Sequence, residues 1–240
     1  QLVGSRLNWR NLLKEINMFG TSYTGGISTY RSASEINSAM ARVYNYMMLA
    51  ILNSALVSFL ISSSPELMAV LFGTGLKWII LFAPLVAIFA ISYFMDKVDK
   101  TGAQLMLHGF AALMGLSLST IFIVYTTSSI FMAFISSAIL FGVMSAYGYF
   151  TKKDLSSIGQ FMFVGLIAII IASIVNVFVG SSVMTMVISA LAIIIFLGLT
   201  AYDTQRIREM VSINRPEDNV EVSGALSLYM NFINIFINLL

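Results

Sequence analysis

One acidic side chain and three amides are the residues of this sequence whose type and spacing could do chemistry in apolar surroundings. Asp203 follows a long apolar run, residues 182–202, in the stretch "GLTAYDTQRIREM". Asn231, Asn234 and Asn238 recur at steps of three and four in "ALSLYMNFINIFINLL", which places all three on one face of a helix. Carboxylate and amide oxygens suit a hard cation such as Ca²⁺, so these residues could bind a cation weakly or line an ion path.

The same residues have plainer interpretations. An acid at the end of a helix is easily solvated, and amides on one helix face can hydrogen-bond to a neighbouring helix. A helix C-terminus is the negative end of the helix dipole, so Asp203 there needs a donor or a cation. Arg206, one turn further on, and the amide face are the two candidates for this partner. Amides are unfavourable against lipid, so we expect the stripe to face the bundle interior, where hydrogen bonding and a pore lining stay equally open.

Other chemistry is not indicated by the sequence. It contains one histidine, His108, and no cysteine, which argues against a zinc or haem site. The motifs G-x-S-x-G, H-E-x-x-H and G-x-x-x-x-G-K-[ST] are absent. A net charge of +2 gives no sign of a nucleic-acid partner. We therefore expect a protein that is not an enzyme and that has no cofactor.

The elements that position Asp203 and the amides are membrane-spanning helices. The chain is 58% hydrophobic and only 10% charged, whereas a soluble domain carries about 25% charged residues. A spanning helix needs about 20 mostly apolar residues. Seven segments reach or approach that length: 43–62, 77–95, 103–125, 130–150, 159–180, 182–202 and 225–240. We predict an all-α protein with seven transmembrane helices embedded in a lipid bilayer, since these runs lack the alternation of barrel strands.

The basic residues predict the orientation of these spans. All thirteen lysines and arginines except Lys77 fall in the N-terminal tail or in alternate loops. Positive loops favour the cytoplasm, so we predict a cytoplasmic N-terminus and a C-terminus outside. Residues 1–35 form a cytoplasmic tail and residues 36–240 a membrane domain. Within the tail, residues 2–19 read equally well as an amphipathic helix on the membrane and as a disordered segment, and "SASE", residues 32–35, has the spacing of a capping box that begins a helix.

Several segments together resemble a known family. "FTKKDLSSIGQF", "FLGLTAYDTQRIREM" and "ALSLYMNFINIFINLL" are similar to segments of the Bax inhibitor-1 (TMBIM) family, and "GFAALMGLSLSTIFIVYT" points to its bacterial YccA-type branch. The likeness covers about residues 36–240. It implies six helices wrapped around a central seventh, in a bacterial inner membrane. Family members are described as pH-sensitive calcium leak channels that protect eukaryotic cells against stress-induced death, and some bacterial members restrain a membrane-anchored ATP-dependent protease.

The resemblance also implies site residues. The family's pH sensor is a pair of aspartates, and Asp203 in "AYDTQ" matches the first, whereas Asn231 occupies the position of the second. Two adjacent carboxylates shift each other's titration, and an amide cannot take part in this coupling. We therefore predict pH gating that is weaker, displaced towards acid, or absent. The family's basic partner for the first aspartate has its nearest match in Lys97 of "FMDKVDK".

Two functional hypotheses follow. In the first, Asp203, Asn231, Asn234 and Asn238 form the path and sensor of a calcium leak, with weak Ca²⁺ binding at Asp203 and with Arg206 or Lys97 as a charge partner. In the alternative, the protein is regulatory and binds a membrane protease complex through its cytoplasmic tail.

Overall fold

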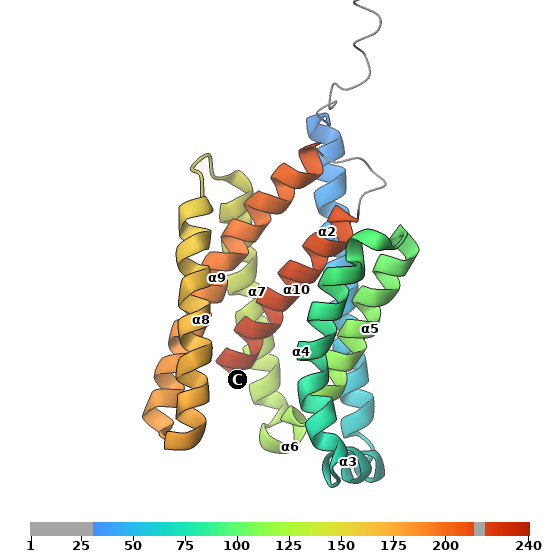
Figure 1. Cartoon of the computed structure of the whole chain (residues 1–240), viewed down its shortest axis with the longest axis vertical. Coiled ribbons are helices and arrows are strands. Elements are labelled where there is room, and N and C mark those ends of the chain that lie inside the picture. Colours follow the sequence, from blue (N-terminus) through green and yellow to red (C-terminus); the bar gives the residue numbers. More distant parts are fainter. Residues whose placement is uncertain (1–30, 214–218) are drawn as a thin grey trace, which may run out of the picture. The chain divides into compact units, whose positions relative to one another are not determined.

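The computed structural model describes residues 31–213 and 219–240, and all regular structure in these residues is helical. Seven helical stretches are long and apolar enough to cross a membrane, which confirms the predicted spans. They are α2 (Ala33–Ser62), α4 (Leu76–Phe94), α5 with α6 (Lys100–Leu118 and Ile121–Val124), α7 (Thr127–Phe150), α8 (Ser156–Val179), α9 (Ser182–Ile213) and α10 (Val220–Leu239) (Figure 1). Helices suit this environment because they satisfy their own backbone hydrogen bonds. The predicted amphipathic segment, residues 2–19, lies outside the described residues.

Local sequence signals set several helix ends. The predicted capping box is confirmed: the Ser32 hydroxyl accepts from the amide of Glu35, and the Glu35 carboxylate accepts from the amide of Ser32 at 2.7 Å. Asp99 caps α5 in the same way by accepting from the amide of Gly102 at 3.1 Å. Helix α8 ends at Gly180, whose φ of 68° is left-handed.

Two helices extend further than the apolar runs predict. Helix α9 continues past Asp203 to Ile213, because Ile207 and Val211 in its polar stretch are buried at 2% and 1% exposure. Asp203 therefore lies within a helix, so the prediction that it stands at a helix end, against the helix dipole, is wrong. The sequence also concealed the short helix α3 (Pro65–Phe72), which begins with the cap Ser64 and a proline in its first turn.

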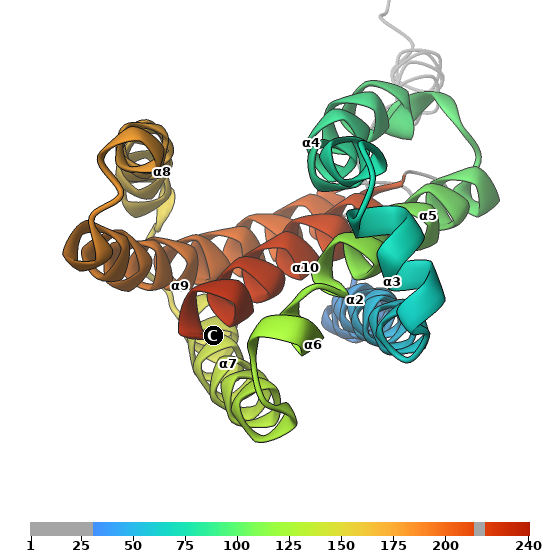
Figure 2. The same ribbon diagram turned by 90° about the horizontal axis from the view of Figure 1, so that it is seen from below.

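The helices pack in pairs around α10. Helix α10 is the most buried span and contacts α2, α5, α7 and α9. Helix α4 packs mainly on α5, and α8 packs mainly on α9, so both stand at the margins of the bundle when it is seen from below (Figure 2). The expectation that six helices wrap around the seventh stays a prediction, since α4 and α8 make few contacts with α10.

Two pairs of helices approach each other closely enough for their backbones to touch. A side chain on Gly148 of α7 would collide with the backbone of Ala201 in α9, and one on Gly115 of α5 would collide with the backbone of Ser54 in α2. Small residues allow membrane helices to approach this closely. Helix pairs α7–α9 and α2–α5 are therefore held backbone to backbone.

The outer surface is apolar, as a bilayer requires. Large hydrophobic side chains stand exposed along every span, most densely on α8, where Phe178 is 85% exposed. Such surface would be a liability in water and is expected in lipid.

Candidate functional site

Asp203 and Asn231 meet at the contact between α9 and α10. The Asn231 side-chain amide donates to the Asp203 carboxylate, with Nδ2 2.7 Å from Oδ2. Asn231 is 5% exposed and Asp203 is partly buried. Helix α10 has a short row of polar side chains among apolar ones. Because α9 continues as a regular helix through Asp203, the Asp203 side chain faces this row. The contact joins the two helices through a hydrogen bond to a carboxylate, which is a strong class of hydrogen bond.

The other two amides continue the stripe along α10. Asn234 donates its Nδ2 to the carbonyl of Met230 at 2.7 Å, and Asn238 donates to the carbonyl of Asn234 at 2.9 Å. These donors are thus occupied by their own helix. No described residue donates to the side-chain oxygens of Asn234 or Asn238, so both oxygens remain available as ligands.

A cavity of about 820 Å³ lies against this face of α10. Asp203 and the three asparagines all line it, together with residues of α4, α8 and α9. Serines add hydroxyl groups to the wall at Ser92, Ser173, Ser223 and Ser227. The residues selected from the sequence as an ion path therefore share one cavity.

The two predicted charge partners are placed differently. Arg206 lines the same cavity but forms no ion pair within the described part of the chain. Lys97 lies beyond the end of α4, in the short 3₁₀ helix η1 (Met95–Lys97), with its ammonium 3.3 Å from the centre of the Tyr93 ring. In the described residues Lys97 makes no salt bridge with Asp203. Asp203 thus forms its hydrogen bond with Asn231, while Arg206 lies near enough to interact with the charge of Asp203 without forming an ion pair with it.

Metal-binding capacity at the site is modest. Among the described residues no three His, Cys, Asp or Glu side chains cluster closely enough to hold a metal ion. One carboxylate with neutral amide oxygens can hold Ca²⁺ only weakly, because tight calcium sites use six to eight oxygens, several of them charged.

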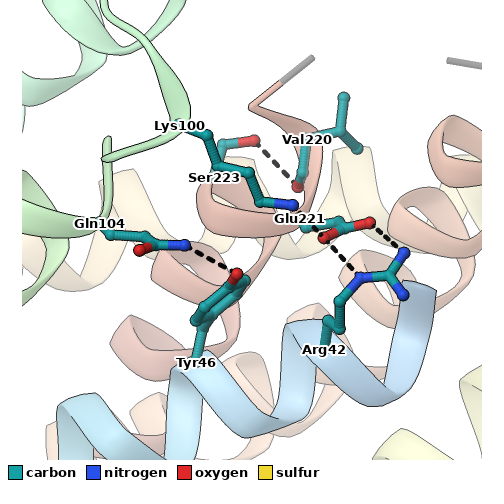
Figure 3. A network of polar contacts seen from close by, with 7 residues as sticks. All are labelled: Arg42, Tyr46, Lys100, Gln104, Val220, Glu221 and Ser223. Carbon is teal, nitrogen blue, oxygen red and sulfur yellow. Dashed lines mark hydrogen bonds and ion pairs between the residues drawn. The ribbon is translucent and has the colours of Figure 1, made fainter. Parts of the chain in front are cut away.

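A second polar cluster, which sequence reasoning missed, lies at the first turn of α10. Glu221 is 3% exposed and accepts two hydrogen bonds from Arg42 of α2, from Nε at 2.9 Å and from Nη2 at 2.6 Å (Figure 3). Lys100, at the start of α5, contacts the same carboxylate at 3.1 Å. Beside it, Gln104 of α5 donates to the hydroxyl of Tyr46 in α2 at 2.7 Å. This ion cluster ties three helices together at the end of the bundle where α2, α5 and α10 begin.

Some sequence signal for this cluster existed. An acid in the first turn of a helix is favoured by the helix dipole, and Glu221 occupies that position in "NVEVSGA". The ion pair joins Arg42 to Glu221, which are 179 positions apart. Residue spacing in the sequence therefore could not predict this pair. Arg42 and Lys100 entered the sequence analysis only as indicators of orientation.

Asn219 fixes the same end of α10 to a neighbouring connection. Its Nδ2 donates to the carbonyls of Met95 and Val98, at 2.7 and 2.8 Å. These carbonyls lie in the link between α4 and α5, so the start of α10 is held by both charge and hydrogen bonds.

Comparison with known proteins identifies relatives of this chain. Residues 36–240 match the family described as "Inhibitor of apoptosis-promoting Bax1". The chain is 39% identical over 206 residues to "Uncharacterized protein RP147" of Rickettsia prowazekii, covering 84% of this chain and 86% of that protein. It is 38% identical over 207 residues to "Inner membrane protein YbhL" of Escherichia coli, covering 84% and 88% of the two chains. A match over nearly the whole membrane domain, with seven spans and an inner-membrane relative, shows that this is a multi-pass bacterial inner-membrane protein of the Bax inhibitor-1 family.

Proposed function

We propose that this protein is a passive leak path for cations, with calcium as the favoured ion, and that the Asp203–Asn231 contact closes it. The observation that carries this proposal is the hydrogen bond between the two side chains on the wall of a cavity that Asn234 and Asn238 also line. A cation entering the cavity meets one carboxylate and a row of amide oxygens.

Weak binding is what a leak requires. An ion must enter its site readily and leave it again, so a site with a single charge serves conduction better than a tight cage. Beyond the charged ligand Asp203, the side-chain oxygens of Asn234 and Asn238 provide further, uncharged ligands for the ion along α10. Opening then requires α9 and α10 to separate at Asp203, because the hydrogen bond to Asn231 spans that contact.

The response to pH should be weak. Two carboxylates in one site compete for a proton and can form a switch near neutral pH. Here Asn231 stands opposite Asp203, so a single titrating group faces a permanent donor. We propose that the leak is only weakly modulated by pH and that Asn231→Asp introduces the missing partner.

Calcium flux into liposomes tests the proposal. Asp203→Asn should lower the calcium flux, because Asp203 is the only carboxylate among the described residues that line the cavity. Asp203→Ala should give a higher flux than Asp203→Asn, because it also removes the contact with α10 that closes the path. Asp154→Asn is a matched control, because Asp154 lies in the loop between α7 and α8, where it accepts a hydrogen bond from the amide of Ser156. Equal flux in wild type and both Asp203 variants would refute the proposal.

A pH series separates the sensor from the path. Flux in Asn231→Asp should vary more steeply with pH than flux in wild type, because the variant contains the carboxylate pair. If both proteins show the same pH profile, the role given to Asn231 is wrong even where the leak itself is real.

The protease hypothesis remains a prediction from the sequence. Its proposed contact segment, the tail of residues 1–35, falls almost entirely outside the described residues. Deleting residues 1–30 and measuring the turnover of membrane-protease substrates in cells separates the two functions, since the leak resides in α9 and α10. Unchanged turnover would exclude the tail as the contact.

A further inference from the structure

The cavity beside Asp203 has walls that differ from its floor. The floor is the asparagine face of α10, whereas the walls are mostly aliphatic: Leu85 and Ile88 on α4, Leu166, Ile169 and Ile170 on α8, and Ile188 on α9. Within the described chain, the helices α4 and α8 do not pack against each other, because one packs mainly on α5 and the other mainly on α9 (Figure 2). The cavity is therefore open to the side, between two helices that face the bilayer.

The aliphatic walls of this cavity favour an apolar occupant, whereas its asparagine face favours a polar one. Its volume of about 820 Å³ would hold roughly 27 water molecules at about 30 Å³ each. Water in that position would contact aliphatic walls and, at the opening, the acyl chains of the bilayer. Removing apolar surface from water is the main favourable term in assembly, so an acyl chain entering from the side is the better filling for the walls.

Arg206 supplies a charge for a headgroup at one end of this cavity. It is exposed and lines the cavity, and no described carboxylate lies within salt-bridge distance of it. The Asp203 carboxylate lies one helical turn away and is engaged by Asn231. A guanidinium pairs with phosphate through a planar fork of donors.

The depth of Arg206 suits a phosphate. Its neighbour Gln205 accepts from the amide of Leu155 at 2.9 Å and donates to the carbonyl of Lys153 at 2.8 Å. Both partners belong to the connection between α7 and α8, where the chain leaves the apolar spans. Arg206 therefore lies next to the level at which the chain turns between two spans, which is where a phospholipid headgroup is expected.

We propose that this cavity binds one phospholipid, which enters between α4 and α8, pairs its phosphate with Arg206 and lays an acyl chain along the aliphatic walls formed by α4 and α8, across the cavity from the asparagine face of α10. The bound chain occupies the side opening of the cavity and so narrows the access to the Asp203–Asn231 contact. Lipid binding itself does not depend on the leak; only its consequence, a lower calcium flux when the lipid is bound, rests on the proposed function.

Native mass spectrometry of the purified full chain tests the headgroup. The protein is stripped of lipid in detergent and offered phosphatidylglycerol or a diacylglycerol with the same chains but no phosphate. Wild type should retain one phosphatidylglycerol and less diacylglycerol, and Arg206→Gln should lower the retained phosphatidylglycerol about fivefold. Arg208→Gln is the matched control, because Arg208 donates to the carbonyl of Tyr149 and stacks on its ring outside the cavity. Equal retention by the two variants, or equal retention of the two lipids, overturns the proposal.

Spin labelling tests the acyl chain. The chain has no cysteine, so a single introduced cysteine carries the only label. Ser173→Cys places the label on the wall of the cavity formed by α8. Ile174→Cys places it on the exposed outer surface of α8. In nanodiscs of phosphatidylglycerol and phosphatidylcholine, both labels should relax with oxygen rather than with a water-soluble nickel chelate. A label at position 173 that relaxes with nickel while the control does not would show water in the cavity and overturn the proposal. Neither measurement involves ion transport, so the lipid site and the leak can fail separately.

Discussion

Breaking the Glu221 ion cluster should destabilise the protein in a defined order. Glu221 is almost fully buried, whereas the side chains of Arg42 and Lys100 are 46% and 38% exposed. Removing one partner of a fully buried pair costs about 3–5 kcal/mol, and removing an exposed pair costs about 0–1 kcal/mol. This cluster lies between those limits, because its acid is buried and its cations are partly solvated.

Each substitution leaves a different residue unsatisfied. Arg42→Gln leaves a buried carboxylate with Lys100 alone, which should cost about 2–3 kcal/mol. Glu221→Gln removes the buried charge but turns an amide donor towards two donors, and should cost about 1–2 kcal/mol. Lys100→Gln leaves both Arg42 hydrogen bonds intact, and we expect a loss of about 1 kcal/mol or less.

Thermal unfolding in nanodiscs, followed by circular dichroism, measures these effects. At about 2–4 °C per kcal/mol for a chain of this size, Arg42→Gln should lower Tm by roughly 4–12 °C. Lys77→Gln, a cation outside the cluster, should leave Tm nearly unchanged. The double variant Arg42→Gln with Glu221→Gln should lose less than the sum of the two single losses, since the first change removes the partner of the second. Additive losses, or an Arg42→Gln protein as stable as wild type, would refute the reasoning.

Three further substitutions probe the packing of α10 and α9. Asn219→Ala removes two hydrogen bonds to the link between α4 and α5. Stability should therefore fall by about 1–2 kcal/mol, and hydrogen exchange in that link should rise; unchanged exchange there would contradict the role of these bonds. Gly148→Ala forces α7 away from the backbone of α9 and should cost about 1–3 kcal/mol, whereas Gly142→Ala on the same helix points into open space and should be neutral; similar melting of the two variants would contradict the close contact. Tyr229→Phe removes the hydroxyl that lies 2.7 Å from Ser54, with an expected loss of about 1 kcal/mol and an unchanged fold, and a gain in stability would show that this hydrogen bond is not stabilising.

The number and type of the membrane spans could be predicted because lipid leaves few choices. A run of about 20 apolar residues in a bilayer must be helical, and seven such runs are present in the sequence. The amide face of α10 was also readable, since a periodicity of three and four fixes which residues share a side. That Asp203 reaches this face follows from the resemblance together with the cost of leaving amides against lipid.

The remainder depends on contacts that spacing does not encode. The extension of α9 beyond Asp203 depends on the burial of Ile207 and Val211 against other helices. A hydropathy average over the surrounding polar residues does not reveal these two apolar positions. The Glu221 cluster joins α2, α5 and α10, and nothing in the sequence says which cation meets which acid. The side opening between α4 and α8 exists because these two helices do not pack against each other. The amino-acid composition does not predict which helices pack together.

The length of α9 has a mechanical consequence. Its 32 residues extend about 48 Å, well beyond the roughly 30 Å of a hydrocarbon core, so a stiff rod overhangs the bilayer or lies steeply inclined in it. At its far end the carbonyl of Ser212 accepts from the amide of Arg31, just ahead of α2. Because α9 is one continuous helix, a displacement of the chain at Arg31 would also shift the end of α9, and with it the helical turn that contains Asp203.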